Sequence, residues 1–150
     1  MTGVQTCALP ISRDAPQAKR AGNGDVIDGA SALRLRSISG CDGVMVARGA
    51  LGNPWIYRDI QAALEGMPTP PAPTLTERKQ AVLRHIDWQL HYEAHPLGHL
   101  RRIICWYFVN LPGVAELRDR IHRSQSVDEL RSLVHSFSGE PSIVHDSRRQ

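Results

Sequence analysis

Residues 43–60, GVMVARGALGNPWIYRDI, constrain the fold of this chain more than any other segment. An apolar run at residues 43–47 stops at Arg48, and Asn53 and Pro54 then offer an N-cap and a first-turn proline. A strand, a glycine turn and a helix N-terminus in succession let α/β proteins build an anion pocket from backbone N–H groups. The sequence therefore predicts an α/β unit with a phosphate site after the strand.

A second tight turn of similar character, Gly-Asn-Gly-Asp, occupies residues 22–25. Its separation from the first turn matches one strand–helix step of a (β/α) barrel, in which the loops after the seventh and eighth strands often form a phosphate site. We therefore expect residues 22–25 and 47–49 to lie side by side and to hold one phosphoryl group. Glycine lets the backbone approach closely, and Arg48 can add positive charge.

The bulk composition limits how much of such a barrel is expected. The chain has 150 residues, whereas a complete TIM barrel takes roughly 250. With 41% hydrophobic and 22% charged residues, the chain is expected to be globular. The net charge of +3, supplied mostly by arginine, is compatible with a nucleic-acid partner. A solvated arginine-rich surface explains it equally well.

The cysteines and histidines give no sign of a disulfide framework or a metal site. Three cysteines, an odd number with no CxxC pair, indicate reduced thiols and a cytoplasmic protein. His91, His95 and His99 recur every four residues, but Pro96 interrupts that helix face, so exposed histidines are expected. No apolar run approaches the roughly 18 residues of a membrane span, and no signal peptide is evident.

The pattern along the chain predicts five segments. Residues 5–11 resemble a translated sequencing adapter, and residues 14–21 lack the branched apolar side chains of a buried strand, so the strand before Gly22 is expected to be damaged or absent. A proline-rich stretch at residues 67–73 predicts a linker. The five segments are an artefact or damaged leader (1–21), the C-terminal end of a barrel (22–66), this linker (67–73), a helical domain (74–138) and a loose tail (139–150).

Capping signals place the helices. Asp28 and Gly40 bound a predicted helix at residues 29–39, and another is expected at 54–64. Beyond the linker the pattern is helical only, with capping boxes at 74–77 and 126–129 and breaks at 96–98 and 112–113. Its apolar faces predict a small bundle of four helices. The predicted core positions are Val82, Leu83, Ile86, Leu90, Leu100, Ile103, Ile104, Tyr107, Leu111, Val114, Leu117, Ile121, Leu130, Leu133, Val134 and Phe137.

Arginines gather around the break at residues 112–113, namely Arg101, Arg102, Arg118, Arg120 and Arg123. If the flanking helices form a hairpin, some of these side chains share one face. That face is either a footprint for a phosphate backbone or an ordinary solvated helix surface. Trp106 and Tyr107 could stack on a base, but their helical spacing beside Ile103 and Ile104 favours the core.

Residues 22–25 and 40–56, together with 106–107, 111–118 and 121–123, resemble the C-terminal end of the tRNA-dihydrouridine synthase family. The resemblance implies an FMN-dependent oxidoreductase on a TIM barrel, followed by a helical domain that binds tRNA. Such flavoproteins reduce the C5–C6 double bond of uridine with NADPH, and the full-length enzyme is expected to be a monomer. The target base must leave its stack to reach the flavin.

The resemblance also assigns residues. The FMN phosphate would be held by Asn23, Gly24, Asp25, Ala47 and Arg48, and tRNA would be contacted by Arg101, Arg102, Arg118 and Arg123. Three positions depart from the family pattern: Ala47 replaces a usual glycine, Ile103 a histidine and His122 an asparagine.

No catalytic residue is expected in this chain. The family's proton-donating cysteine belongs to an earlier part of the barrel, and Cys41 does not match its motif. We therefore expect the chain by itself to show neither turnover nor tight, stoichiometric FMN uptake. Two alternatives remain open: another FMN-dependent TIM-barrel oxidoreductase that acts on a small molecule, and a helical RNA-binding module without chemistry. A basic face on the helical domain would favour a tRNA enzyme over a small-molecule enzyme.

Overall fold

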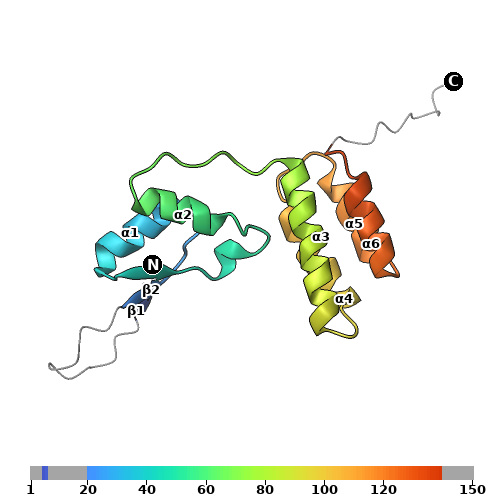
Figure 1. The fold of residues 1–150 in the computed structure, drawn as a ribbon, viewed down its shortest axis with the longest axis horizontal. Coiled ribbons are helices and arrows are strands. Elements are labelled where there is room, and N and C mark those ends of the chain that lie inside the picture. Colours follow the sequence, from blue (N-terminus) through green and yellow to red (C-terminus); the bar gives the residue numbers. More distant parts are fainter. Residues whose placement is uncertain (1–4, 7–19, 140–150) are drawn as a thin grey trace. The chain divides into compact units, whose positions relative to one another are not determined.

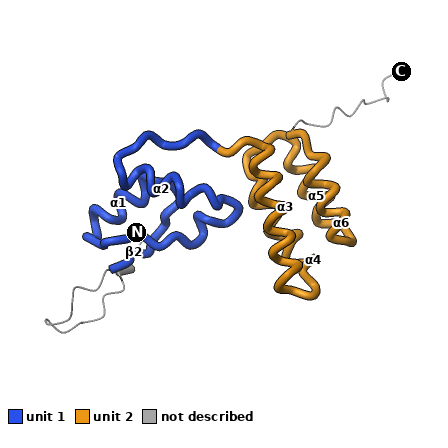
Figure 2. The backbone as a smooth tube through the Cα atoms, in the orientation of Figure 1, with its two compact units in different colours: residues 1–72 blue, residues 73–150 orange. Residues whose placement is uncertain are grey.

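The computed structural model describes residues 5–6 and 20–139 and divides the chain into two compact units, residues 1–72 and residues 73–150 (Figure 2). The leader expected at residues 1–21 lies almost entirely outside the described residues, and so does the tail expected at 139–150. Each unit is described by itself below.

Unit 1, residues 1–72, contains a small three-stranded sheet with the order β1-β2-β3. Strand β1 (Gln5–Thr6) runs antiparallel to β2 (Ala21–Asn23), which runs parallel to β3 (Gly43–Met45). Helix α1 (Gly29–Ser39) connects β2 to β3, contacts both strands and packs against α2 (Ile56–Leu64) (Figure 1). The parallel strands joined by a helix form one βαβ step.

The strand expected before Gly22 would occupy residues 14–21, of which only residues 20 and 21 are among the described residues. Gly22 itself lies in β2, which pairs with β3. Gly22 lies opposite Val44, and the pairing uses backbone groups, so it does not need branched side chains. A Cβ at Gly22 would lie 2.7 Å from Cys41 Sγ, so the buried thiol occupies the space that a side chain would need. The strand is short, at three residues.

Helix α1 has both predicted bounds. Asp28 Oδ1 accepts a hydrogen bond from the Ser31 N–H at 2.7 Å, and Ser31 Oγ in turn accepts from the Asp28 N–H. Gly40 ends the helix with φ 61°, in the left-handed region, and its N–H donates to the Arg36 carbonyl. Local capping signals thus determine this helix.

The predicted start of α2 was wrong. Asn53 and Pro54 precede the helix, which begins at Ile56 with Trp55 at the N-cap and no side-chain cap bond. The Asn53 carbonyl accepts from the Ile56 N–H at 3.3 Å, so residues 53–56 form a turn that leads into the helix. Together α1 and α2 bury the core of unit 1, which consists of Val26, Ala32, Leu35, Ile56 and Ile60.

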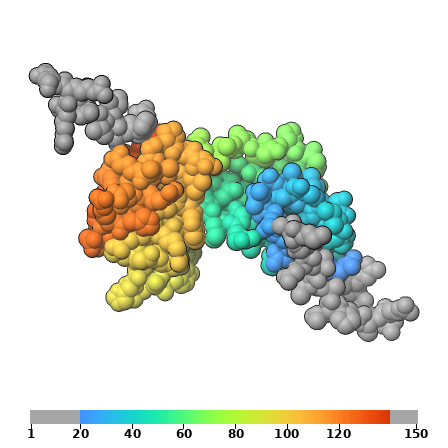
Figure 3. Space-filling model, turned by 180° about the vertical axis from the view of Figure 1, so that it is seen from behind, coloured from blue at the N-terminus to red at the C-terminus, as the bar shows by residue number. Residues whose placement is uncertain are grey.

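Unit 2, residues 73–150, contains four helices in the described region: α3 (Leu75–Tyr92), α4 (Leu97–Tyr107), α5 (Val114–Arg123) and α6 (Val127–Ser136). Each helix contacts the next one, and α6 also contacts α3. In Figure 3 the later part of this unit, yellow to orange, forms one closely packed face. The most deeply buried apolar side chains of the unit are Val82, Ile86, Leu100, Ile104, Phe108, Ile121, Leu130 and Val134.

The helix caps of unit 2 agree with those predicted from the sequence, with one difference. Thr74 and Glu77 form the predicted reciprocal capping box. Ser126 Oγ accepts from the Glu129 N–H, but the Glu129 carboxylate accepts from the Gln125 N–H instead of closing the box. The placement of Leu90 in the core was also wrong, since this side chain is exposed.

The described residues include neither a membrane-spanning helix nor a metal-binding cluster. None of their helices is long and apolar enough to cross a bilayer. The same residues contain no group of three or more His, Cys, Asp or Glu side chains suited to a metal ion. His91 and His95 are exposed, as the sequence predicts, whereas His99 is half-buried.

Candidate phosphate site and arginine surface

The parallel pairing of β2 and β3 brings the two glycine turns together. Asn23 lies opposite Met45, so both strands end at the same edge of the sheet and the loops that follow them are neighbours. Asp25, in the first loop, accepts a hydrogen bond at 2.7 Å from Arg48 Nη2 in the second. The two loops that the sequence analysis singled out therefore lie side by side.

A cavity of about 210 Å³ opens between these loops. Its lining includes one basic residue, Arg48, and one acidic residue, Asp25, which pair with each other. The lining residues are Gly24, Asp25, Val26, Ile27, Ala47, Arg48 and Gly49. Asn23 ends β2 and lies next to this lining, though it is not part of it.

Gly49 allows the close approach of the two loops. A Cβ at this position would lie 2.1 Å from the Val26 carbonyl oxygen and 3.0 Å from Ile56 Cδ1. The first of these distances is far inside van der Waals contact, so only glycine fits without displacing the backbone of the facing loop. The narrow cavity thus depends on one missing side chain.

The second loop continues into a single 3-10 turn, η1 (Arg48–Ala50), in which the Ala50 N–H donates to the Ala47 carbonyl at 3.1 Å. The first N–H groups of such a turn have no acceptor within it and can donate to an anion. Ala47 has φ −111°, outside the left-handed region that favours glycine.

These features fit the phosphate end of a cofactor. Backbone N–H groups and a guanidinium fork are the donors that phosphate oxygens accept. The cavity volume of about 210 Å³ is smaller than the 300–1,000 Å³ typical of pockets that enclose a whole ligand. This cavity is therefore of a size for a phosphoryl group and not for a whole cofactor.

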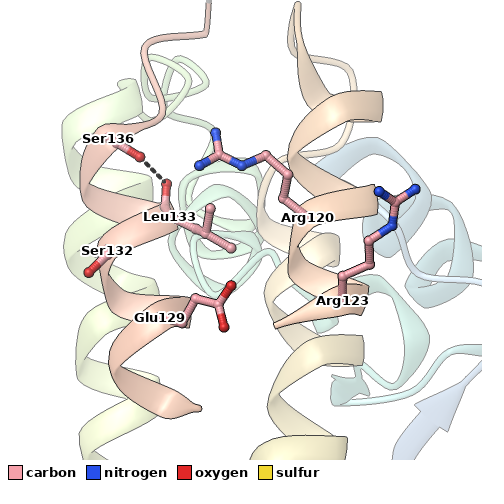
Figure 4. A pocket seen from close by; sticks show the side chains of 6 residues that line it. All are labelled: Arg120, Arg123, Glu129, Ser132, Leu133 and Ser136. Atoms are coloured by element: carbon pink, nitrogen blue, oxygen red, sulfur yellow. Dashed lines mark hydrogen bonds between the residues drawn. The ribbon is translucent and has the colours of Figure 1, made fainter. Parts of the chain in front are cut away.

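The arginines of unit 2 divide between two settings. Arg120 and Arg123 of α5 line a cavity of about 420 Å³ together with residues of α6, and Arg120 extends toward α6 (Figure 4). The α6 residues that line it are Glu129, Ser132, Leu133 and Ser136. Arg123 also pairs with Asp119 at 2.9 Å. This surface offers cationic and hydroxyl donors suited to an extended anion.

Arg101 has a different environment. Its Nη2 donates to the carbonyl of Ser124, a fully buried residue at the end of α5, and its Nε is buried without a hydrogen-bond partner. Arg102, the next residue, is exposed, and so is Arg118. The geometry thus gives Arg101 a role in the structure, while Arg102, Arg118 and Arg123 are exposed at the surface.

Neither described cysteine has the environment of a reactive thiol. Cys41 is buried beside Gly22. Burial raises the pKa of the Cys105 thiol, although Arg118 nearby opposes that shift, and Cys105 Sγ donates to the Arg101 carbonyl at 3.2 Å. A thiolate nucleophile needs a lowered pKa and open access, so neither residue has the environment of a nucleophile.

Comparison with known proteins agrees with this geometry. The sequence model of the family described as "Dihydrouridine synthase (Dus)" matches residues 13–139. A probable tRNA-dihydrouridine synthase of Mycobacterium leprae is 37% identical over 120 residues, which are 79% of this chain and 31% of that protein. tRNA-dihydrouridine synthase B of Pseudomonas aeruginosa is 32% identical over 79% of this chain and 36% of its own length. The chain thus spans about a third of these curated relatives.

Proposed function

This chain belongs to the dihydrouridine synthase family, and we propose that it forms the C-terminal part of a tRNA-dihydrouridine synthase. The enzyme would be an FMN- and NADPH-dependent oxidoreductase that reduces the C5–C6 double bond of uridine in tRNA. In this proposal unit 1 supplies the last strand–helix units of the TIM barrel. Unit 2 is the helical bundle that binds tRNA, and the reduced thiols suit a cytoplasmic enzyme.

The observation that carries the proposal is the cavity shared by the loops after β2 and β3. In it, the backbone of Gly24 and Gly49 and the Arg48 side chain would bind the FMN phosphate. Asp25 would orient Arg48 through its ion pair, and Asn23 and Ala47 would flank the anion. Bound FMN would supply the hydride, and the residues of this chain would only anchor and orient it.

Neither described cysteine lines the cavity of unit 1, since Cys41 is buried beside Gly22 and Cys105 belongs to α4. We therefore propose that the catalytic cysteine belongs to the part of the barrel that this chain does not cover. The 150-residue chain by itself would then show no turnover.

The phosphate site can be tested by titrating the isotope-labelled chain with FMN or with riboflavin, which lacks the phosphate. FMN should shift the amide resonances of Gly24, Arg48 and Gly49, with an affinity far below that of a holoenzyme. Riboflavin should leave these resonances unchanged. Equal shifts with both compounds, or shifts confined to other residues, would reject the phosphate site.

The RNA partner can be tested by a mobility-shift titration of the chain with tRNA at several salt concentrations. Binding through phosphate contacts should weaken as salt rises. Binding releases counterions from the RNA, and their release into a more concentrated salt solution gains less free energy. A small-molecule oxidoreductase would show no such binding. A non-catalytic RNA-binding module would bind tRNA but would show no FMN-specific shift in unit 1.

A further inference from the structure

Two large aromatic side chains on α3 lie in solvent and stack on each other. Trp88 is 61% exposed and Tyr92 is 73% exposed. Their ring centroids are 5.8 Å apart and their planes differ by 6°, while the His91 ring meets Tyr92 edge-on. The buried side of the same helix, through Val82 and Ile86, packs into unit 2 and does not include this pair.

Stacking fixes the orientation of these rings and leaves flat aromatic surface open to water. Removal of that apolar surface from water would be favourable, so the exposed pair suits a ligand that covers it. The pair sits at positions i and i+4 of α3, where side chains are neighbours on the helix surface. A flat aromatic ring is the ligand that extends such a stack with the least rearrangement.

The charges around the stack favour an anionic partner. Asp87 is paired with Arg131 of α6, and the Glu93 carboxylate lies 3.6 Å from His99 Nδ1, so both acidic neighbours are engaged. Arg84, one turn before Trp88, is exposed and forms no ion pair within the described residues. A cation beside an aromatic surface fits a base and its phosphate together.

We propose that Trp88 and Tyr92 form a stacking platform for an unpaired base of RNA, with Arg84 on a neighbouring phosphate. A base inside a duplex already stacks on both faces, so only a base in a loop, bulge or single-stranded end can use the platform. That the natural ligand is tRNA depends on the proposed function. The platform itself depends only on the geometry of α3.

The test uses the whole 150-residue chain and dye-labelled RNA read by fluorescence anisotropy. The probes are a single-stranded oligoadenylate and a fully paired RNA hairpin of the same length. Trp88→Ala should weaken oligoadenylate binding by roughly tenfold, since it removes the larger ring on which the base would stack. Trp88→Phe should retain most of the affinity. Leu90→Ala, also exposed on α3 but outside the stack, is the matched control and should bind like the wild type.

Three results would overturn the platform. The first is equal oligoadenylate affinity in the Trp88→Ala and Leu90→Ala variants. The second is a wild-type chain that does not bind the oligoadenylate. Equal affinity for hairpin and oligoadenylate, unchanged by Trp88→Ala, would count in the same way. The third is a wild-type dimer, seen by sedimentation, that Trp88→Ala dissociates, because a second copy would then cover the surface.

Failure of the platform and failure of the proposed function are distinguishable. If tRNA still binds with steep salt dependence while Trp88→Ala has no effect, the platform is wrong and the family function stands. If oligoadenylate binding depends on Trp88 but tRNA does not bind, the platform is correct and the tRNA assignment fails.

Discussion

Arg48 Nη2 lies 2.7 Å from Asp25 Oδ1, so one ion pair links the loops that follow two neighbouring parallel strands. Both side chains are largely exposed, and such pairs contribute about 0–1 kcal/mol to stability. The pair therefore matters more for where it holds the guanidinium than for the folding free energy. It keeps a cation at the cavity formed by the two glycine turns.

Replacement of Arg48 by alanine should abolish the phosphate-dependent response to FMN without unfolding the chain. The guanidinium is the cationic group that lines the cavity, and surface substitutions of this kind change stability by about 0.5 kcal/mol or less. The response is measured as the difference between FMN- and riboflavin-induced amide shifts. Arg36→Ala, on exposed α1 surface away from the cavity, is the control. If both variants respond alike, Arg48 does not bind the phosphate.

Gly49→Ala should destabilise unit 1 by about 1–3 kcal/mol, because the added methyl group overpacks a tight contact. Its Cβ would lie 2.1 Å from the Val26 carbonyl oxygen, and backbone cannot move aside as a flexible side chain can. Gly43→Ala is the matched control, since a Cβ there meets nothing within 4 Å. Urea unfolding followed by circular dichroism should separate the two variants. Equal midpoints would show that the loops approach each other less closely than described.

Asp28→Ala should lower the free energy of unfolding by about 1 kcal/mol, because α1 loses its N-cap. The Ser31 N–H, and then the Ser31 hydroxyl, hold the pKa of the Asp28 carboxyl below its ordinary value. This stabilisation is therefore complete above the unfolded pKa of about 3.9 and is lost as the pH falls through the lower folded value. Thermal melts should show a difference in melting temperature between wild type and variant at pH 7, and this difference should disappear in strong acid. A difference independent of pH would contradict the capping bond.

The sequence could predict α1 and its bounds because Asp28, Ser31 and Gly40 act within the helix itself. It could not predict that Gly22 lies in a paired strand. That strand depends on pairing with Val44 and on the space beside Cys41, and both residues are distant in sequence. The juxtaposition of the two glycine turns followed from barrel topology. The cavity between them is narrow because of Gly49, whose contact with Val26 has no local signal.

The aromatic pair on α3 was missed for a related reason. Spacing of four residues from Val82 through Ile86 suggested that Leu90 continues the buried face. Each such step turns the helix by about 40° beyond a full turn, so Leu90 lies about 80° from Val82 and is exposed. The spacing of Trp88 and Tyr92 was visible in the sequence. Their position off the core needed the packing of α3 against its neighbours.

Unit 2 should become less stable in mild acid because of His85, whose Nδ1 lies 2.9 Å from the Tyr107 hydroxyl oxygen. Burial, and then the nearby His99, hold the pKa of His85 below its ordinary value, so the folded state favours the neutral ring. Stability should be full above about pH 6.5 and should fall as the pH drops toward the folded pKa, since the unfolded state binds the proton more readily. Melts from pH 8 to 5 measure this loss. His85→Gln should reduce it, whereas the exposed-histidine variant His122→Gln should keep it.

Two adjacent arginines should respond in opposite ways to substitution. Arg101→Ala should destabilise unit 2 by about 1–3 kcal/mol, because the carbonyl of buried Ser124 loses its donor. Arg102 is exposed, and its loss should leave the urea midpoint unchanged while it weakens tRNA binding and lowers the salt slope by about 1. Sequence alone could not separate them, since neighbouring residues on a helix point about 100° apart. Unfolding and salt-dependent binding measured on both variants decide the matter. Equal destabilisation of the two would show that Arg101 does not hold the end of α5, and equal loss of binding at unchanged stability would return Arg101 to the RNA surface.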